Sequence, residues 1–254
     1  CISLDIKKYK SILSKSSLNK KEINNVIKNY IKLTSNIILK LKDNVRKYEY
    51  GEDLFLKLKK SNNSTINKIF LLINNCKNYG TLPFANLARM GFIAVEFLNS
   101  FENLNIINKK EKKHFLETIK SISLNMNKCL KKSKRLFIKY YGHLRPNTYE
   151  ISTPNYKENF NNYFKNISII HKKTKKFSFN YKQKKRINKL LNKNNFKNIN
   201  ADVLIDFIEN SIYHRENSKL FFTKIIDEIF NQLNNLSKRI GISKKDIQYL
   251  NIKK

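Results

Sequence analysis

Apolar residues recur at helical spacing along almost the whole of this 254-residue chain, and this periodicity constrains its fold more than any other feature. No alternation of apolar and polar residues is long enough to predict a β-strand. The hydrophobic content of 41%, with 17 Phe and 13 Tyr, can fill a sizeable core. The sequence therefore predicts a single all-α domain over residues 1–254, an irregular multi-helix fold with one long ordered loop near residues 141–159.

Capping residues predict where several helices begin and end. Asn108 with Glu111 has the spacing of a capping box, and the helix that follows is expected to run on to Met126. Asn200 is expected to cap a long helix. That helix should stop near Gly241, since glycine is common just after a helix C-terminus.

Glycine, proline and alanine are scarce, and their positions are informative. The chain has five Gly and three Pro, and six of these eight residues fall within residues 80–91 and 142–154. Small and conformationally special residues in so biased a composition indicate places where geometry demands them. Arg89 is expected to be buried in the first window and to need an anionic partner. Four small residues should let a neighbouring helix or a ligand approach the backbone closely: Ala85, Ala88, Gly91 and Ala94.

The second window combines side chains that a helix does not need, and we interpret it as part of a binding site. Its imidazole, guanidinium and phenol groups suit an anionic or hydroxyl-bearing small molecule. A second basic cluster begins at Arg215. The candidate ligand-binding residues are Arg89, Arg145, Tyr149, Arg215, Glu216 and Lys219, with His143 as a candidate general base.

Plainer interpretations stay open for these residues. His143 could serve only to bond a loop carbonyl, and Arg145 could tie the loop to a helix C-terminus or to Glu150 or Glu158. The cluster at 215–219 could be a solvated face. No glycine-rich phosphate loop, Ser/His/Asp order or metal-ligand spacing occurs, so the sequence predicts no metal site, no cofactor and no autonomous catalysis in this chain.

The formal net charge of +33 raises a second class of function, a basic helical module that binds nucleic acid. Only seven of the 52 cationic residues are Arg, and the Lys residues are scattered among abundant Asn. Readers of nucleic-acid sequence usually depend on Arg. A general drift toward Lys, Asn and Ile explains the charge without any selected binding surface and is the favoured interpretation, which leaves non-specific binding to polyanions as the alternative.

The cysteines and the apolar runs bear on where the protein acts. Cys1, Cys76 and Cys129 are widely spaced and form no CxxC pair, which favours a reduced, cytoplasmic setting. Uninterrupted apolar runs are too short to cross a bilayer, and no signal peptide opens the chain. A start at Cys rather than Met indicates a piece of a longer polypeptide.

Three segments resemble a known family. Residues 141–158, YGHLRPNTYEISTPNYKE, resemble the segment YGHLRPGTYDI followed by SPRYxE in a group of bacterial phosphoenolpyruvate synthase-like proteins. They resemble more distantly the YGHRG segment of rifampicin phosphotransferase. Residues 79–95 and 215–224 agree in order, and the resemblance spans roughly residues 75–252. Asn147 and Asn155 stand where the family has Gly and Arg.

The resemblance implies that this chain is the helical middle region of an ATP-dependent phosphotransferase. Such proteins carry an ATP-grasp domain before this region and a swivelling phosphohistidine domain after it, so ATP and Mg²⁺ are expected for the parent protein. His143 does not correspond to the shuttle histidine. The leading hypothesis is an acceptor-binding domain whose predicted site residues converge on one pocket and in which Arg and Lys stabilise a phosphoryl group.

Overall fold

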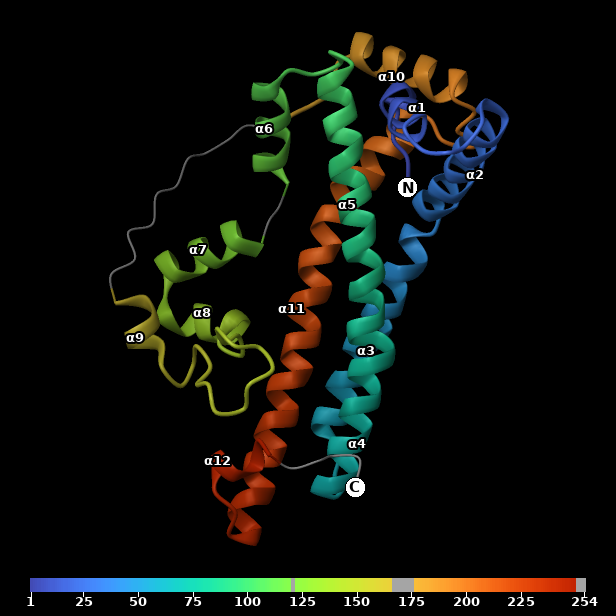
Figure 1. Ribbon diagram of the computed structural model, residues 1–254. Coiled ribbons are helices and arrows are strands. Elements are labelled where there is room, and N and C mark those ends of the chain that lie inside the picture. The colour runs from blue at the N-terminus through green and yellow to red at the C-terminus, as the bar shows by residue number, and fades with distance from the viewer. Residues whose placement is uncertain (120–121, 166–175, 250–254) are drawn as a thin grey trace. The chain divides into compact units, whose positions relative to one another are not determined.

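The computed structural model describes residues 1–119, 122–165 and 176–249 (Figure 1). These residues form helices and no strand, which confirms the all-α prediction, and the long loop occupies residues 142–159. The surface connection that the sequence predicts over 168–178 lies mostly outside the described residues, as does His171, for which the sequence suggests no role.

The helices are α1 (Ile6–Leu13), α2 (Lys20–Leu39), α3 (Leu41–Lys60), α4 (Thr65–Asn75), the π-helix η1 (Cys76–Thr81), α5 (Leu82–Asn103), α6 (Lys109–Thr118), α7 (Ile122–Lys132), α8 (Lys134–Tyr141), α9 (Phe160–Phe164), α10 (Tyr181–Lys193), α11 (Ala201–Ile240) and α12 (Lys244–Ile247).

The predicted caps are confirmed. The side chains of Asn108 and Glu111 exchange hydrogen bonds with each other's backbone N–H at 2.9 and 2.8 Å. The Asn200 side chain accepts from the third N–H of α11 at 2.9 Å, and α11 is one continuous helix of 40 residues. Gly241 ends it with φ +72°, a left-handed conformation that glycine adopts without strain.

The helix predicted to run from Asn108 to Met126 is instead two helices. Ile119 leaves α6 with an extended conformation, ψ 128°, and its side chain is buried. The helical spacing of apolar residues continues across this break, so periodicity alone does not reveal it. A second helix, α7, begins separately at Ile122.

The run from α4 through η1 to α5 is one continuous stretch of helical backbone. Pro83 near the start of α5 lacks an N–H, and in a regular α-helix a proline ring clashes with the carbonyl four residues earlier. The six residues before α5 form the π-helix η1, a geometry that relieves such a clash, and the helical backbone continues through Pro83.

This continuous helix is much longer than the uninterrupted apolar runs, which by themselves are too short to cross a bilayer. Thr65–Asn103 is the one helix in the described part of the chain that is long and apolar enough to cross a membrane, with a mean hydropathy of 1.2 in its most apolar segment. Of that segment, 44% is buried inside the protein. Core helices of soluble proteins have the same length and composition, so this helix by itself is weak support for a membrane span.

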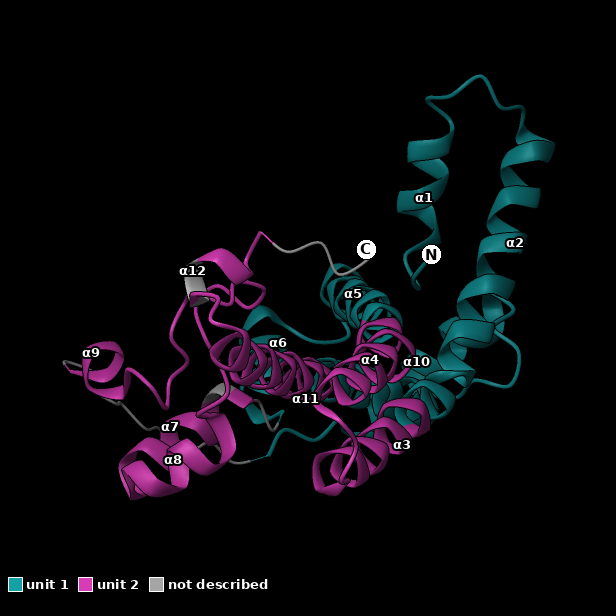
Figure 2. Ribbon diagram, turned by 90° about the horizontal axis from the view of Figure 1, so that it is seen from below, with its two compact units in different colours: residues 1–45, 85–120, 172–215 teal, residues 46–84, 121–171, 216–254 magenta. Residues whose placement is uncertain are grey.

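The chain divides into two compact units (Figure 2), and the prediction of a single domain stays a prediction. Three of the five boundaries between the units fall within helices, namely α3, α5 and α11. Unit 1 comprises residues 1–45, 85–120 and 172–215, and unit 2 comprises residues 46–84, 121–171 and 216–254.

Unit 1 has an apolar core built mainly on its part of α5. Phe97 and Phe101 are fully buried and make edge contacts with Phe196 and Phe179, with ring centroids 6.0 and 5.9 Å apart. The N-terminal hairpin of α1 and α2 belongs to this unit (Figure 2). Glu96 on α5 accepts hydrogen bonds from two side chains of α1, at 2.7 and 3.1 Å, and so holds that helix.

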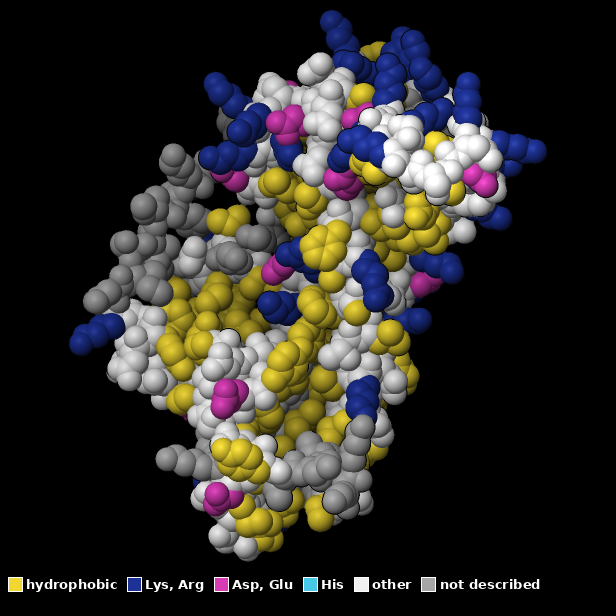
Figure 3. Space-filling model, viewed as in Figure 1, with side chains coloured by type: hydrophobic (Ala, Val, Ile, Leu, Met, Phe, Trp, Pro, Cys, Tyr) yellow, Lys and Arg dark blue, Asp and Glu magenta, His cyan; other side chains and the backbone are white. Residues whose placement is uncertain are grey.

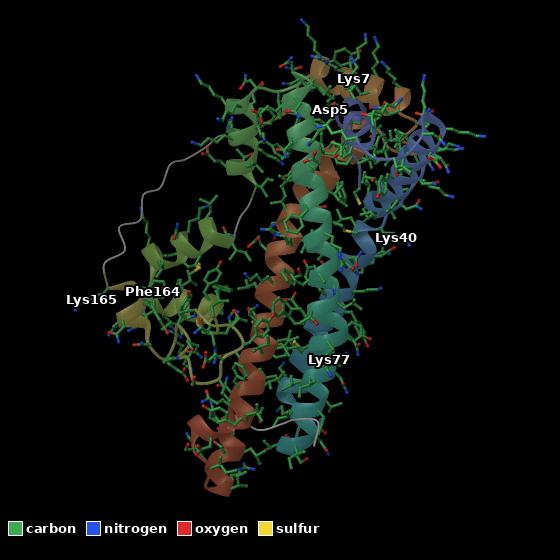
Figure 4. All side chains as sticks on the ribbon, viewed as in Figure 1. Asp5, Lys7, Lys40, Lys77, Phe164 and Lys165 are labelled. Atoms are coloured by element: carbon green, nitrogen blue, oxygen red, sulfur yellow. The ribbon has the colours of Figure 1, made fainter. Side chains whose placement is uncertain are left out.

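In unit 2, η1 packs at very short range against both α11 and α3. A β-carbon added to Gly80 would lie 2.9 Å from Cβ of Phe222, and one added to Gly51 would lie 2.4 Å from Cβ of Tyr79. These glycines are therefore required for close helix packing. Elsewhere in the unit, Phe137 on α8 is fully buried among aromatic rings that include Phe164 on α9, which Figure 4 labels.

Candidate functional site

The loop at 142–159 is fixed to α11 by the buried side chain of Arg145. Its Nη2 forms an ion pair with Oδ1 of Asp227, and its Nη1 donates to the carbonyls of Glu150 and Thr153 at 3.5 and 3.3 Å. The guanidinium also lies 4.8 Å from the ring centre of Phe230. Arg145 thus holds two turns of the loop and one helix together.

Asn155 provides the second attachment of the loop. Its Nδ2 donates to Oδ1 of Asp227 at 3.0 Å, and its side chain is buried. Asn155 and Glu158 also exchange side-chain to backbone hydrogen bonds at 2.8 and 2.9 Å, which fixes the turn between them. Burial raises the pKa of Asp227 above its usual value, while the bonds from Asn155 and Arg145 act to lower it.

His143, at the start of the loop, also contacts α11. Its Nε2 lies 3.2 Å from the carbonyl oxygen of Leu220 and 3.2 Å from Oγ1 of Thr223. Because a carbonyl only accepts, Nε2 carries the proton, and the Thr223 hydroxyl is free to accept since it donates to the same carbonyl at 2.9 Å. Nδ1 of His143 is then the acceptor nitrogen.

The charge state of His143 follows from its surroundings. Burial, together with the nearby cations Lys224, Arg145 and Lys59, lowers the pKa of His143 from 6.5 to about 3. The imidazole is therefore neutral at pH 7 and a weak proton acceptor. It is better suited to orient a polar group than to remove a proton.

A cavity of about 320 Å³ lies beside these residues, entirely within unit 2. Helices α3, α8 and α11 and the loop each contribute to its wall. Apolar surface comes from α3 and α8, whereas the other side chains are charged or polar. Its lining residues are Phe55, Lys59, Ile138, Lys139, Gly142, His143, Asn155, Lys157, Glu158, Lys224, Asp227, Glu228 and Asn231.

The cations of the cavity differ in how far they are neutralised. Lys59 lies 3.5 Å from the carboxylate of Glu228, which is itself almost buried. Lys224 is half-buried and makes no ion pair with any described residue, and Lys139 and Lys157 are exposed. Three of these four ammonium groups form no ion pair with a described carboxylate, and Glu52 interacts with Lys224 electrostatically.

The structure brings together only part of the predicted site. Of the predicted residues in unit 2, His143 lines the cavity and Arg145 supports its wall through Asp227. Tyr149 is 73% exposed and lines a separate groove together with residues of α11 and α12. Glu216 and Lys219 lie on α11 outside the cavity lining, and Lys219 is exposed.

Arg89 and Arg215 belong to unit 1. The expectation that Arg89 is buried is wrong, because position 89 lies on an exposed face of α5, where its Nη1 donates to Oδ1 of Asn86 at 3.3 Å. Close approach at Gly91 is confirmed, since a β-carbon there would lie 3.1 Å from Cδ of Arg215. The convergence of all predicted residues on one pocket stays a prediction.

Sequence reasoning missed the acidic partner of the loop, Asp227. A signal was present: acidic residues number only 19 in the chain, and Asp227 and Glu228 interrupt the apolar run between Phe221 and Phe230. A carboxylate placed in a buried helical segment needs a cation. Nothing in the sequence indicates that Lys59 and Lys224 differ from the other lysines.

Within the described ranges, no group of three or more His, Cys, Asp or Glu side chains could hold a metal ion. Comparison of the chain with models of known protein families, with curated proteins and with solved structures gives no match.

Proposed function

We propose that the cavity of unit 2 binds a small anionic molecule, and that the chain is the acceptor-binding helical domain of an ATP-dependent, phosphoenolpyruvate synthase-like phosphotransferase. The supporting observation is the set of cations around a neutral, fixed His143. The family and its reaction rest on the resemblance of residues 79–95, 141–158 and 215–224.

The charge of the cavity favours an anion. Four lysines line it and Arg145 lies behind Asp227, against the three carboxylates of Asp227, Glu158 and Glu228. With Glu52, whose carboxylate interacts electrostatically with Lys224, five cations against four carboxylates leave a net charge of +1. A phosphate monoester carries about −1.5 to −2 at neutral pH, so the cavity would attract such a group.

The polar groups of the wall have distinct roles in this proposal. Lys224 offers an ammonium donor from α11, and Lys157 offers another from the loop. Nδ1 of His143 can accept from a hydroxyl of the acceptor. Asn231, whose Nδ2 lies 3.4 Å from Oδ2 of Asp227, adds an amide that can turn toward a ligand.

The chemistry in this proposal is positioning and charge stabilisation. Ammonium groups held in a half-buried cavity stabilise the negative charge of a transferring phosphoryl group more than they would in bulk water. ATP, Mg²⁺ and the phosphohistidine come from the flanking domains that the resemblance implies. His143 orients the acceptor hydroxyl in this scheme.

Titration with inorganic phosphate, followed by NMR, tests the anion site directly. Phosphate should shift the signals of His143 and Asn155 in a saturable manner, and Lys224→Gln should weaken the binding about tenfold, the loss of roughly one charge-assisted hydrogen bond. Lys238→Gln, at an exposed position of the same helix, is the matched control. Equal weakening in both variants, or shifts spread over surface lysines without saturation, would contradict the site.

The family assignment has an independent test in the coding sequence on either side of this chain. An ATP-grasp domain upstream and a swivelling phosphohistidine domain downstream are expected. Flanking sequence of another kind would contradict the assignment to a phosphotransferase. The proposal of an anion site would still stand if the titration supports it.

A further inference from the structure

Helix α10 carries a row of lysines along one face. Lys182, Lys185, Lys189 and Lys193 follow one another at spacings of three and four residues, which places them on the same side of the helix. All four are exposed, and none forms an ion pair with another described residue. Figure 3 shows dark blue side chains gathered over the part of unit 1 that holds α10, α1 and α2.

The opposite face of α10 is fixed to the core of unit 1. Ile187 and Leu191 are completely buried. Polar side chains on the flanks add further attachments. Arg186 donates to the carbonyls of the two residues that follow α5, at 2.5 and 2.9 Å, and Lys184 pairs with Asp202 at 2.7 Å. The lysine row therefore stands on a helix with a fixed orientation.

The lysine row lacks internal compensation. Helix α10 contains no Asp or Glu, so neighbouring lysines at i,i+4 repel each other by about 0.2–0.5 kcal/mol per pair. A row of this kind is most stable when a polyanion covers it. It extends for about 16 Å along the helix axis, the rise of eleven residues.

Groups suited to bases and sugars flank the row. Tyr181, the first residue of α10, is 78% exposed and offers an aromatic face for stacking. Beyond Lys193 a groove is lined by Asn192, Asn195, Phe196, Lys197, Asn198, Ile199 and Asn200. Its amides can both donate and accept hydrogen bonds.

We propose that α10 and the groove after it form a nucleic-acid-binding surface, in which the lysine row contacts the phosphodiester backbone without reading sequence. This surface is independent of the cavity in unit 2. A membrane surface is the less suitable partner, because interfacial helices insert an apolar face and that of α10 is buried with Ile187 and Leu191.

The salt dependence of binding measures the contribution of the row. Four phosphate contacts give a slope of about −3.6 in log K against log salt concentration for duplex DNA and about −2.8 for a single strand. We would replace all four lysines of the row by Gln, and measure fluorescence anisotropy with labelled random-sequence 20-mers, double- and single-stranded, between 50 and 200 mM salt. The control protein replaces Lys47, Lys57, Lys60 and Lys77 by Gln. These are four exposed lysines of unit 2 that form no ion pair with any residue the structure describes, and Figure 4 labels Lys77.

Both variants have the same net charge, so only the position of the lysines differs. The row variant should lose about 3 units of slope, and the control variant less than 1. Equal losses in the two variants would overturn the proposal and assign the binding to overall charge. Binding to phosphatidylserine vesicles that oligonucleotides do not displace would also overturn it, in favour of a membrane partner. Thermal melting would verify that both variants fold.

Discussion

The neutral state of His143 predicts that acid destabilises the fold in a way that one substitution removes. In the unfolded chain this imidazole has an ordinary pKa of 6.5, whereas in the folded protein burial and neighbouring cations lower it to about 3. Between these two values the unfolded state binds more protons than the native state. Stability is therefore full above pH 6.5 and falls as the pH decreases toward 3.

The size of this effect can be calculated. From pH 8 to pH 5, the unfolded imidazole titrates through about 1.5 pH units below its pKa while folded His143 stays neutral, which costs about 2 kcal/mol. Urea unfolding of the wild-type protein and of His143→Gln at the two pH values measures it. Glutamine is the suitable replacement because its amide can donate to the Leu220 carbonyl as Nε2 does.

The difference between the two proteins isolates one imidazole, since the other three histidines are common to both. The wild-type protein should lose about 2 kcal/mol more than His143→Gln between pH 8 and pH 5. NMR titration of the imidazole signals gives a second measurement, with the His143 signal expected to titrate below pH 4. If the two proteins show the same pH dependence, His143 is protonated freely in the native state, and the account of its burial and cationic surroundings is refuted.

Two further substitutions test the packing of unit 2. Asp227→Ala leaves the buried guanidinium of Arg145 without its carboxylate, so the free energy of unfolding measured with urea should fall by about 3–5 kcal/mol. A double variant that also replaces Arg145 by Met should recover part of this loss, because no buried charge is then left unpaired. Gly80→Ala places a β-carbon 2.9 Å from Cβ of Phe222, and we expect thermal or urea unfolding to show a loss of about 1–3 kcal/mol despite the better helix propensity of Ala. An unchanged or more stable Gly80→Ala protein would contradict the close packing of η1 against α11.

Local sequence signals predicted three of the helix boundaries. Asn108 and Asn200 begin helices because side-chain caps act within four residues, and Gly241 ends one because it alone adopts a positive φ there without cost. The break at Ile119 was not predictable in this way. Ile119 is buried like other apolar residues of the pattern, so nothing in the periodicity marks it as the residue where the helix ends.

The site was less predictable than the fold, because a binding site depends on contacts between distant segments. The sequence pointed to His143 and Arg145 in the loop, but not to Asp227, which lies 82 residues beyond Arg145 and fixes its position. Lys59 and Lys224 are two among 45 lysines, and only the folded arrangement distinguishes them. Rare residue types could be recognised in advance, whereas common ones could not.

The scarce residues of this chain mark places where helices pack closely. They point to a binding site only where they also line a cavity. In the first window, Gly80 accommodates Phe222 and Gly91 accommodates Arg215, so both glycines are explained by packing within their own units. In the second window, Gly142 and His143 line a cavity that also carries four lysines, of which only Lys59 forms an ion pair with a described carboxylate. The packing role and the site role are separable by experiment, because loss of a packing glycine lowers stability, whereas loss of Lys224 should weaken phosphate binding and leave stability nearly unchanged.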